Sequence, residues 1–319
     1  MCTAISENYL SHLFGRTLDL ELSYGERVTI MPRGFDFPFL HEPQINKYAI
    51  IGVAYTSQDI PLFFDGMNEH GLAIAGLNFP KCAHYHKYES GKKNLASFEM
   101  IPYILRECKN LSEVIHMVEN VNITDESFSK SLPSTPMHWL ISDKSGALVV
   151  EPSECGTRVY QNPFGILTNS PDFIYQRYNL ENYLTLSASP VDSSFIGTRL
   201  DSYSRGLSAF GLPGDYSSTS RFVKGAFVKS CTDKEGNHIS RFFSIMDTIK
   251  VPTGVIKTDM GASVSTVYTS CMDTSELIYY YTTNECRQIQ GVKLSGDLIL
   301  GSDLISYKMK KDEPISFIN

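Results

Sequence analysis

Short apolar stretches, separated by Gly, Pro and Asn, run through the N-terminal part of the chain. They span residues 2–6, 12–19, 28–31, 48–55 and 72–77 and are rich in β-branched and aromatic side chains. Each stretch has the length of a strand, and turn residues separate one from the next. The pattern predicts a set of short β-strands.

Apolar residues recur at helical spacing further along, as at Phe98, Ile101 and Leu105. Helices are expected over residues 97–108, 111–120, 171–184, 220–231 and 240–249. Further strands are expected over residues 137–142, 147–151, 157–160, 165–168, 268–272 and 276–283. The region 187–218 is rich in Ser, Gly and Pro and predicts long loops.

The order of these elements is strands, two helices, strands, two helices, strands. Such an order is typical of an α+β protein in which helices are layered on sheets. No repeat, linker or change of composition divides the chain, so a single domain over residues 1–319 is expected. Hydrophobic residues make up 42% of the chain and occur throughout, which excludes intrinsic disorder.

The charge balance excludes two classes of partner. The chain has 28 Lys and Arg against 35 Asp and Glu, a formal net charge of −7, and no basic tract. A nucleic-acid binder usually has a basic excess, and a membrane-surface protein has a polybasic segment, so neither partner is expected. No apolar stretch approaches the ~20 residues of a membrane helix, and no signal peptide is evident. We expect a cytoplasmic protein.

Metal and cofactor motifs are lacking. The seven cysteines form no CxxC pair, and the nucleotide, zinc-protease and GxSxG motifs do not occur. His84 and His86 could be two metal ligands, but no third ligand lies at suitable spacing, so a solvated loop is favoured and no metal is expected.

Cys2 is the most informative position in the sequence. Removal of Met1, expected before a small residue, would make Cys2 the N-terminal residue. Its thiol would then lie beside its own α-amino group, which titrates just above neutral pH. One residue would supply both nucleophile and base, as in N-terminal-nucleophile hydrolases. The alternative from Cys2 alone is a frayed terminus with an incidental cysteine.

Arg16 and Asp19 lie on the second expected strand. Arg16 could lie beside Cys2 and favour its thiolate by charge. Asp19 could orient the α-amino group through a hydrogen bond. Residues three apart on a strand face opposite sides, so convergence on Cys2 requires a bulge or a strand end. A surface ion pair is the alternative.

The sequence closely resembles the choloylglycine hydrolase family, and within it the conjugated bile salt hydrolases of gut bacteria. The segments that carry the resemblance are Met1-Cys2-Thr3, Phe14-Gly-Arg-Thr-Leu-Asp19, Asp65-Gly-Met-Asn-Glu-His-Gly71, Gly76-Leu-Asn-Phe-Pro80, His138-Trp-Leu-Ile-Ser-Asp143, Leu167-Thr-Asn-Ser-Pro171, Gly211-Leu-Pro-Gly-Asp215, Ser220-Arg-Phe222 and Tyr268-Thr-Ser-Cys271. Each is weak alone, but they span nearly the whole chain in the family's order.

The resemblance implies an αββα N-terminal-nucleophile fold with two stacked antiparallel sheets between helix layers, no cofactor, and a homotetramer. It implies hydrolysis of glycine- or taurine-conjugated bile acids through a Cys2 thioester, and transfer of the acyl group to other amino acids as a further hypothesis. Carried over residue by residue, the catalytic set is Cys2, Arg16, Asp19, Asn78, Asn169 and Arg221. Asn78, through its backbone N–H, and Asn169, through its side chain, match the oxyanion-hole residues. The substrate-lining set is Leu18, Phe64, Leu132 and Met137, for each of which core packing is the alternative.

Two other functions compete with this one. Penicillin V acylases share the fold and nucleophile implied by the resemblance, although Asn78 favours the bile salt branch, since the acylase branch often has Tyr there. A catalytically silent binder of bile salts or lipids is the second alternative, and it would not need a free N-terminal cysteine.

Overall fold

Two antiparallel β-sheets form the centre of the protein, as seen in a computed structural model that describes residues 1–41 and 44–319. The first sheet contains the N-terminal strand. Its order is β14 (Ile166–Leu167), β1 (Cys2–Asn8), β2 (His12–Leu20), β18 (Ser263–Asp273), β19 (Ile278–Thr283) and β20 (Gln290–Lys293), with β17 (Ile256–Lys257) paired to β18. We call it the N-terminal sheet.

The second sheet is built mostly from the middle of the sequence. Its order is β13 (Gly156–Gln161), β12 (Gly146–Ser153), β11 (Met137–Asp143), β8 (Ala73–Asn78), β7 (Ile60–Asn68), β6 (Ile50–Ser57), β3 (Arg27–Met31) and β21 (Ile305–Lys308). We call it the central sheet. All pairings within both sheets are antiparallel.

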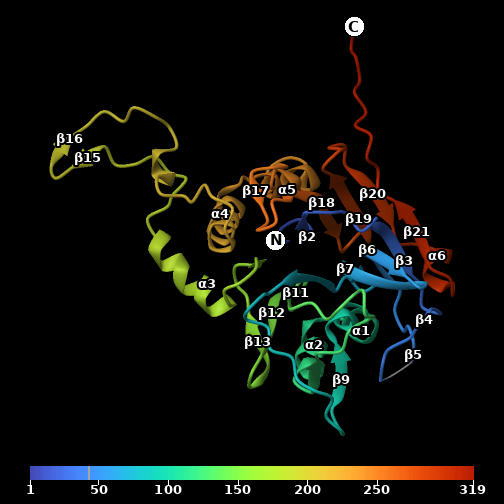
Figure 1. Ribbon diagram of the computed structural model, residues 1–319. Helices are drawn as coiled ribbons and strands as arrows, with labels where there is room; N and C mark the ends of the chain where they lie inside the picture. The colour runs from blue at the N-terminus through green and yellow to red at the C-terminus, as the bar shows by residue number, and fades with distance from the viewer. Residues whose placement is uncertain (42–43) are drawn as a thin grey trace.

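Helices cover the outer face of each sheet. α1 (Met100–Glu107) and α2 (Leu111–Val118) pack on the central sheet, and α4 (Ser218–Cys231) and α5 (His238–Asp247) pack on the N-terminal sheet. Figure 1 shows the resulting order of helices, sheet, sheet and helices. The expected αββα architecture is therefore confirmed.

Alternation along the strands explains why the layers form. In β12, Val149 belongs to the core between the two sheets, whereas its neighbours Leu148 and Val150 belong to the core beneath α1 and α2. In β11, Leu140 and Trp139 divide in the same way. A strand apolar on both faces is stable only when both faces are covered, which two sheets between helix layers achieve.

Strand β7 was not expected from the sequence. Pro61 and the adjacent aromatic residues Phe63 and Phe64 hide its alternation, and a register shift interrupts its pairing with β6 at Val53 and Ala54. Pro102, which weakened the expected first helix, lies in the first turn of α1, where backbone N–H groups have no intrahelical acceptor.

The remaining elements are short. They are α3 (Phe173–Asn179), α6 (Asp297–Leu300), 3₁₀ turns at Ser97–Glu99, Leu180–Tyr183 and Leu207–Ala209, and the strand pairs β4 (Asp36–Phe37) with β5 (Gln44–Ile45), β9 (Lys93–Ala96) with β10 (Val121–Thr124), and β15 (Ser194–Phe195) with β16 (Thr198–Arg199). The expected loop region 187–218 is largely irregular and carries the β15–β16 hairpin, which projects away from the layers in Figure 1.

Candidate active site

The start of the chain is held inside the N-terminal sheet. Strand β1 pairs with β2 so that Cys2 lies opposite Leu18 and Ala4 lies opposite Arg16. Directly opposite residues on paired strands share a face, and every second residue along a strand returns to that face. Cys2, Arg16 and Leu18 therefore all face the central sheet. Cys2 is buried, and its position is set by the sheet rather than left to a free terminus.

A cavity of about 380 Å³ opens over this face of β1 and β2. Cys2, Arg16 and Asn78 are among the residues that line it. All four expected substrate-lining residues are in its wall: Leu18, Phe64, Leu132 and Met137. Its volume lies within the range of small-molecule sites, and such sites are mostly apolar with a few polar groups.

The sequence did not single out most of the aromatic wall of this cavity. Tyr24, Tyr55, Phe98, Phe128 and Trp139 also line it. Tyr24 lies in a loop, and its ring is 5.8 Å from that of Tyr55 and 6.2 Å from that of Phe64, between ring centroids. Nothing in the local sequence of Tyr24 indicates this contact.

Arg16 connects the two sheets beneath the cavity. Its Nη1 donates to the carbonyl oxygens of Phe64 at 3.0 Å and Gly76 at 2.6 Å, both in the central sheet. Its buried Nη2 has no hydrogen-bond partner among the described residues. Burial opposes the charge on Arg16, but the nearby Cys2 and the anionic surroundings outweigh it, and the pKa of Arg16 is raised.

Asp19 lies on the opposite face of β2. Its carboxylate accepts hydrogen bonds from the hydroxyl groups of Thr266 at 2.6 Å and Thr17 at 3.1 Å. The register of β2 against β18 shifts between Thr266 and Tyr268, so the irregularity lies in β18 and leaves the alternation of β2 intact. Arg16 and Asp19 thus approach the chain start from two sides of the sheet. With Met1 in place, it is the backbone of Asp19 that bonds to Met1.

Asn169 contacts three other residues of the expected catalytic set. Its Oδ1 accepts from the backbone nitrogen of Cys2 at 2.8 Å and from Nη2 of Arg221 at 2.7 Å. Its Nδ2 donates to the backbone carbonyl of Asn78 at 2.7 Å. One amide therefore ties the chain start, the end of β8 and the first turns of α4 together.

Arg221 is buried and reaches the chain start from α4. Its Nη1 donates to the carbonyl of Cys2 and to the hydroxyl of Thr3, the latter at 2.6 Å. Burial lowers the pKa of Arg221, against the opposing charges of Asp19 and Cys2. The helix begins just ahead of it because Ser217 accepts from the backbone N–H of Ser220 as an N-cap.

The sequence did not indicate a buried acid, Asp65, that lies close to Arg16. Asp65 accepts hydrogen bonds from the hydroxyl groups of Tyr279 at 2.6 Å and Tyr268 at 2.8 Å. Burial raises the pKa of Asp65, opposed by Arg16 and by the two tyrosines. The one signal in the sequence was its place in a segment shared with the family, since its partners lie more than 200 residues away.

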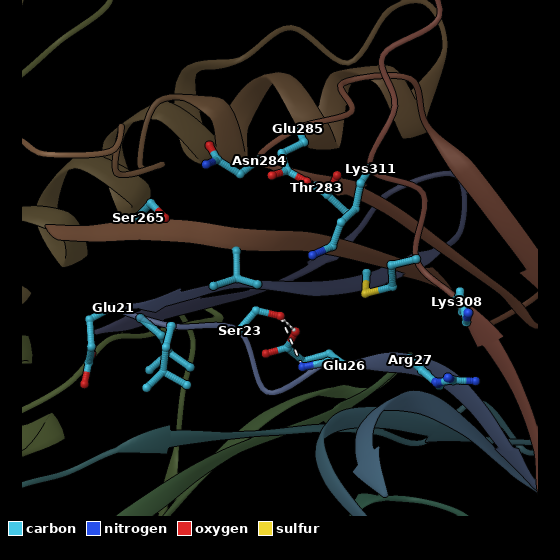
Figure 2. A pocket seen from close by; sticks show the side chains of 15 residues that line it. Glu21, Ser23, Glu26, Arg27, Ser265, Thr283, Asn284, Glu285, Lys308 and Lys311 are labelled. Atoms are coloured by element: carbon cyan, nitrogen blue, oxygen red, sulfur yellow. Dashed lines mark hydrogen bonds between the residues drawn. The ribbon is translucent and has the colours of Figure 1, made fainter. Parts of the chain in front are cut away.

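A second cavity, of about 430 Å³, lies beyond Leu20 and Glu21, which line both cavities. Figure 2 shows its charged side chains, which are Glu21, Glu26, Arg27, Glu285, Lys308 and Lys311. Three acids and three bases favour neither an anion nor a cation, and no cysteine lines it. Of these two cavities, Cys2, the expected nucleophile, lines only the first.

Within residues 1–41 and 44–319, no group of three or more His, Cys, Asp or Glu side chains is placed to hold a metal ion. Among the same residues, no helix is long and apolar enough to cross a membrane.

Comparison with known proteins places this geometry in a family. The family model described as linear amide C-N hydrolases, choloylglycine hydrolase family, matches residues 2–307. A bile salt hydrolase/transferase of Lactiplantibacillus plantarum is 40% identical, and one of Clostridium perfringens is 34% identical, each over the full length of both chains.

Solved structures agree with this placement. A conjugated bile acid hydrolase from Clostridium perfringens superposes with a TM-score of 0.95 at 34% identity over the full length of both chains. A penicillin V acylase from Agrobacterium tumefaciens shares the fold, with a TM-score of 0.77 at 20% identity, covering 96% of this chain and 91% of that one. This chain belongs to the choloylglycine hydrolase family of linear amide C–N hydrolases.

Proposed function

We propose that the protein is a bile salt hydrolase that cleaves the amide bond of glycine- or taurine-conjugated bile acids, with Cys2 as nucleophile. One observation carries the proposal: Cys2 lines a mainly apolar cavity together with Arg16 and Asn78, and its nitrogen is bonded to Asn169. The names of the full-length relatives support the choice of substrate.

Removal of Met1 turns the backbone nitrogen of Cys2 into an α-amino group. That amine accepts the thiol proton, so no separate base is needed. Asn169 Oδ1, 2.8 Å from this nitrogen, holds the amine in place. Asp19 lies on the far face of β2, and its proposed role is to orient the freed amine from that side.

The thiolate attacks the carbonyl carbon of the substrate amide, and negative charge develops on the carbonyl oxygen. The backbone N–H of Asn78 and the side-chain amide of Asn169 are the proposed donors to this oxyanion. Asn169 Nδ2 has two protons, of which one goes to the Asn78 carbonyl. The other is then available to the oxyanion. Loss of one such donor typically slows the reaction ~10²–10³-fold.

Collapse of the tetrahedral intermediate breaks the C–N bond. The α-ammonium returns its proton to the leaving nitrogen, glycine or taurine departs, and the bile acid remains as a thioester on Cys2. Water, deprotonated by the neutral α-amine, then releases the acid. An amino acid amine can attack the same thioester, so acyl transfer is a second expected outcome of this intermediate.

The cavity wall fits a steroid. Leu18, Phe64, Leu132 and Met137 line the cavity and are the proposed contacts with the apolar faces of the steroid. Phe64 is bulky for a wall residue, and its proposed effect is to narrow the slot. Penicillin V acylase is the alternative within the fold, but the acylase with a solved structure is only 20% identical, against 34–40% for the bile salt hydrolases.

The test measures amine release from glycocholate, taurocholate and penicillin V by the wild-type protein and by Cys2→Ala, with loss of Met1 established by mass. Turnover of the bile salts that vanishes in Cys2→Ala supports both reaction and nucleophile. Turnover of penicillin V alone would instead support the penicillin V acylase activity. Binding of bile salts with no turnover of any substrate would instead support the silent binder.

The proposal extends to assembly and location. The segment 187–212 exposes several large apolar side chains, namely Val191, Phe195, Ile196, Leu200, Tyr203 and Phe210. Such a concentration on one projecting arm is unusual for a monomer and supports a homo-oligomer, a tetramer by family resemblance. A cytoplasmic location rests on the sequence argument alone.

A further inference from the structure

A buried histidine and glutamate lie directly behind the proposed oxyanion donors. His138 is on β11 and Glu151 is on the neighbouring strand β12. Neither side chain is appreciably exposed, and Nδ1 of His138 is 3.0 Å from Oε1 of Glu151. The reaction steps above use neither residue.

The hydrogen-bond partners of this pair fix the ring of His138. Nε2 of His138 is 2.8 Å from the backbone carbonyl of Thr168, which can only accept, so Nε2 carries a proton. Oε1 of Glu151 also accepts the backbone N–H of Phe173, the first residue of α3, at 3.0 Å. The Nδ1–Oε1 contact is also a hydrogen bond, so both ring nitrogens of His138 are engaged and the ring is fixed in orientation.

The His138 ring thereby contacts a residue next to each of the two proposed oxyanion donors. Thr168, whose carbonyl it holds, immediately precedes Asn169. Phe79, which immediately follows Asn78, stacks on the same ring with 4.1 Å between centroids and 10° between planes. Both contacts lie in the interior, since His138 and Phe79 are almost completely buried.

We propose that His138, held by Glu151, is a positioning residue that sets the distance between the Asn78 and Asn169 donors. The inference rests on the proposed function. The Asn169 Nδ2 bond to the Asn78 carbonyl spans the same gap directly, and the His138 ring spans it through Thr168 and Phe79. These two supports hold the donors at a fixed separation in both the ground state and the transition state.

The consequence is specific to the chemical step. Donors that stabilise an oxyanion act in the transition state, so their displacement lowers kcat and leaves KM nearly unchanged. A misplacement of about 1 Å can cost ~10²-fold in rate. Alkylation of the Cys2 thiol by iodoacetamide forms no oxyanion, so its rate does not depend on these donors.

The experiment compares His138→Gln, Glu151→Gln and the wild-type protein in glycocholate hydrolysis and in alkylation of Cys2. Glu151→Gln keeps the size of the side chain but replaces the carboxyl group that bonds to Nδ1 of His138. We expect kcat to fall ~100-fold in His138→Gln and ~10-fold in Glu151→Gln. KM and the alkylation rate are expected to stay within about 2-fold of wild type.

His12→Gln is the matched control. His12 is also a buried histidine, but it bonds to Thr274 at 2.9 Å and Ser142 at 2.8 Å, away from the donors, so its kcat should equal that of the wild type. If His138→Gln does not fold, the kcat, KM and alkylation rate of Glu151→Gln alone test the proposal.

Wild-type kcat in the folded variants would overturn the inference. So would an alkylation rate that falls in parallel with kcat, because Cys2 itself would then be displaced. A wild-type protein with no turnover would overturn the proposed function first, and this inference with it.

Discussion

At the scale of single residues, the site depends on which face of a strand each side chain occupies. Arg16 and Cys2 share a face because β1 and β2 pair with Cys2 opposite Leu18. Asp19 directly follows Leu18 on β2, so it faces the opposite side of the sheet, where it bonds to Thr266. The sequence argument held that the side chains of Arg16 and Asp19 converge on Cys2 only at a bulge or a strand end. The irregularity lies instead in β18, about 250 residues away, so β2 keeps its alternation and the two side chains stay on opposite faces.

Asp65 provides a prediction for a single hydroxyl group. Tyr279→Phe removes a 2.6 Å donor to the buried Asp65 carboxylate, and an unsatisfied buried acceptor costs about 1–3 kcal/mol of the free energy of unfolding. Tyr280→Phe is the matched control, because Tyr280 follows on the same strand and faces the opposite side. Urea unfolding measures both. Equal stability of the two variants would show that the hydroxyl group of Tyr279 contributes nothing.

His12 provides a prediction for pH. Burial lowers its pKa to about 4, with Asp143 and Asp273 opposing the shift, so the imidazole is neutral in the folded protein. The unfolded chain takes up a proton near pH 6.5, and the folded chain does so only near pH 4. The contribution of His12 to the free energy of unfolding is therefore fully present above pH 6.5. It is lost as the pH falls to 4, and the loss amounts to up to about 3 kcal/mol.

His12→Gln isolates that contribution. We expect the variant to lose less unfolding free energy than the wild type between pH 6.5 and pH 4, as measured by urea unfolding at each pH. At pH 7 the variant should be the less stable of the two. Parallel pH profiles for the two proteins would contradict the assignment to His12.

The candidate site illustrates how far residues alone can be interpreted. Cys2 could be recognised as a nucleophile from chemistry, but Asn78, Asn169 and Arg221 came from family resemblance, since each alone is typical of a turn or a helix start. The structure joins all four by hydrogen bonds, and Cys2 and Asn78 also line the cavity, while their catalytic roles stay predictions. His138 has no local signal at all, because its partners Glu151 and Thr168 are set by the pairing of strands.

At the scale of elements, most expected strands and helices are confirmed, and boundaries shift by a few residues. The failures have physical causes. β7 contains Pro61, Gly66 and two adjacent phenylalanines, so neither alternation nor propensity marks it. β20 and β21 are short edge segments whose strand character comes from their neighbours in the sheet.

Gly15 provides a prediction for the packing of β2 against β18. A Cβ atom at this position would lie 2.0 Å from the Ser270 carbonyl oxygen and 2.8 Å from the Phe242 ring. The first of these is backbone, so the strands must separate next to Arg16. We expect Gly15→Ala to lower the unfolding free energy by about 3 kcal/mol, the upper part of the usual range for overpacking, and to reduce hydrolysis.

Gly214→Ala serves as the control for Gly15→Ala. No atom lies within 4 Å of a Cβ at Gly214, and its backbone is outside the left-handed region. Its stability and activity should equal those of the wild type in thermal unfolding and amine-release assays. A Gly15→Ala protein as stable as Gly214→Ala would show that β2 and β18 can separate without cost.

At the scale of the whole molecule, the two-sheet core explains where the site can lie. Residues that face inward from both sheets fill the space between them, and the cavity forms where the ends of β1, β2, β7 and β8 leave that space open. The N-terminal residue of the mature chain would be buried in a sheet rather than frayed. The order of elements predicted helices layered on sheets, and the resemblance implied the four layers. Neither predicted this opening, which is lined by aromatic residues from separate strands and loops. The single domain over residues 1–319 stays a prediction.

The projecting segment 187–212 provides the last prediction. The segment projects away from the layers in Figure 1 and its large apolar side chains are exposed, so they contribute little to the stability of one chain and are free to pack on a second copy. We expect the wild-type protein to have a mass near four times 35.8 kDa by light scattering. The double variant Phe195→Ser with Tyr203→Ser should have a smaller mass with unchanged secondary structure.

Met260→Ser provides the comparison that makes this mass change specific. Met260 is almost fully exposed but stands alone in the loop between β17 and β18, and isolated exposed apolar residues are ordinary on protein surfaces. Its replacement should leave the mass unchanged. If the wild-type protein is already monomeric, or if the double variant keeps the wild-type mass, segment 187–212 does not hold copies of the chain together. Because the arm is not among the residues that line the cavity, a change in mass with unaltered kcat would show that assembly and catalysis are separate properties of this fold.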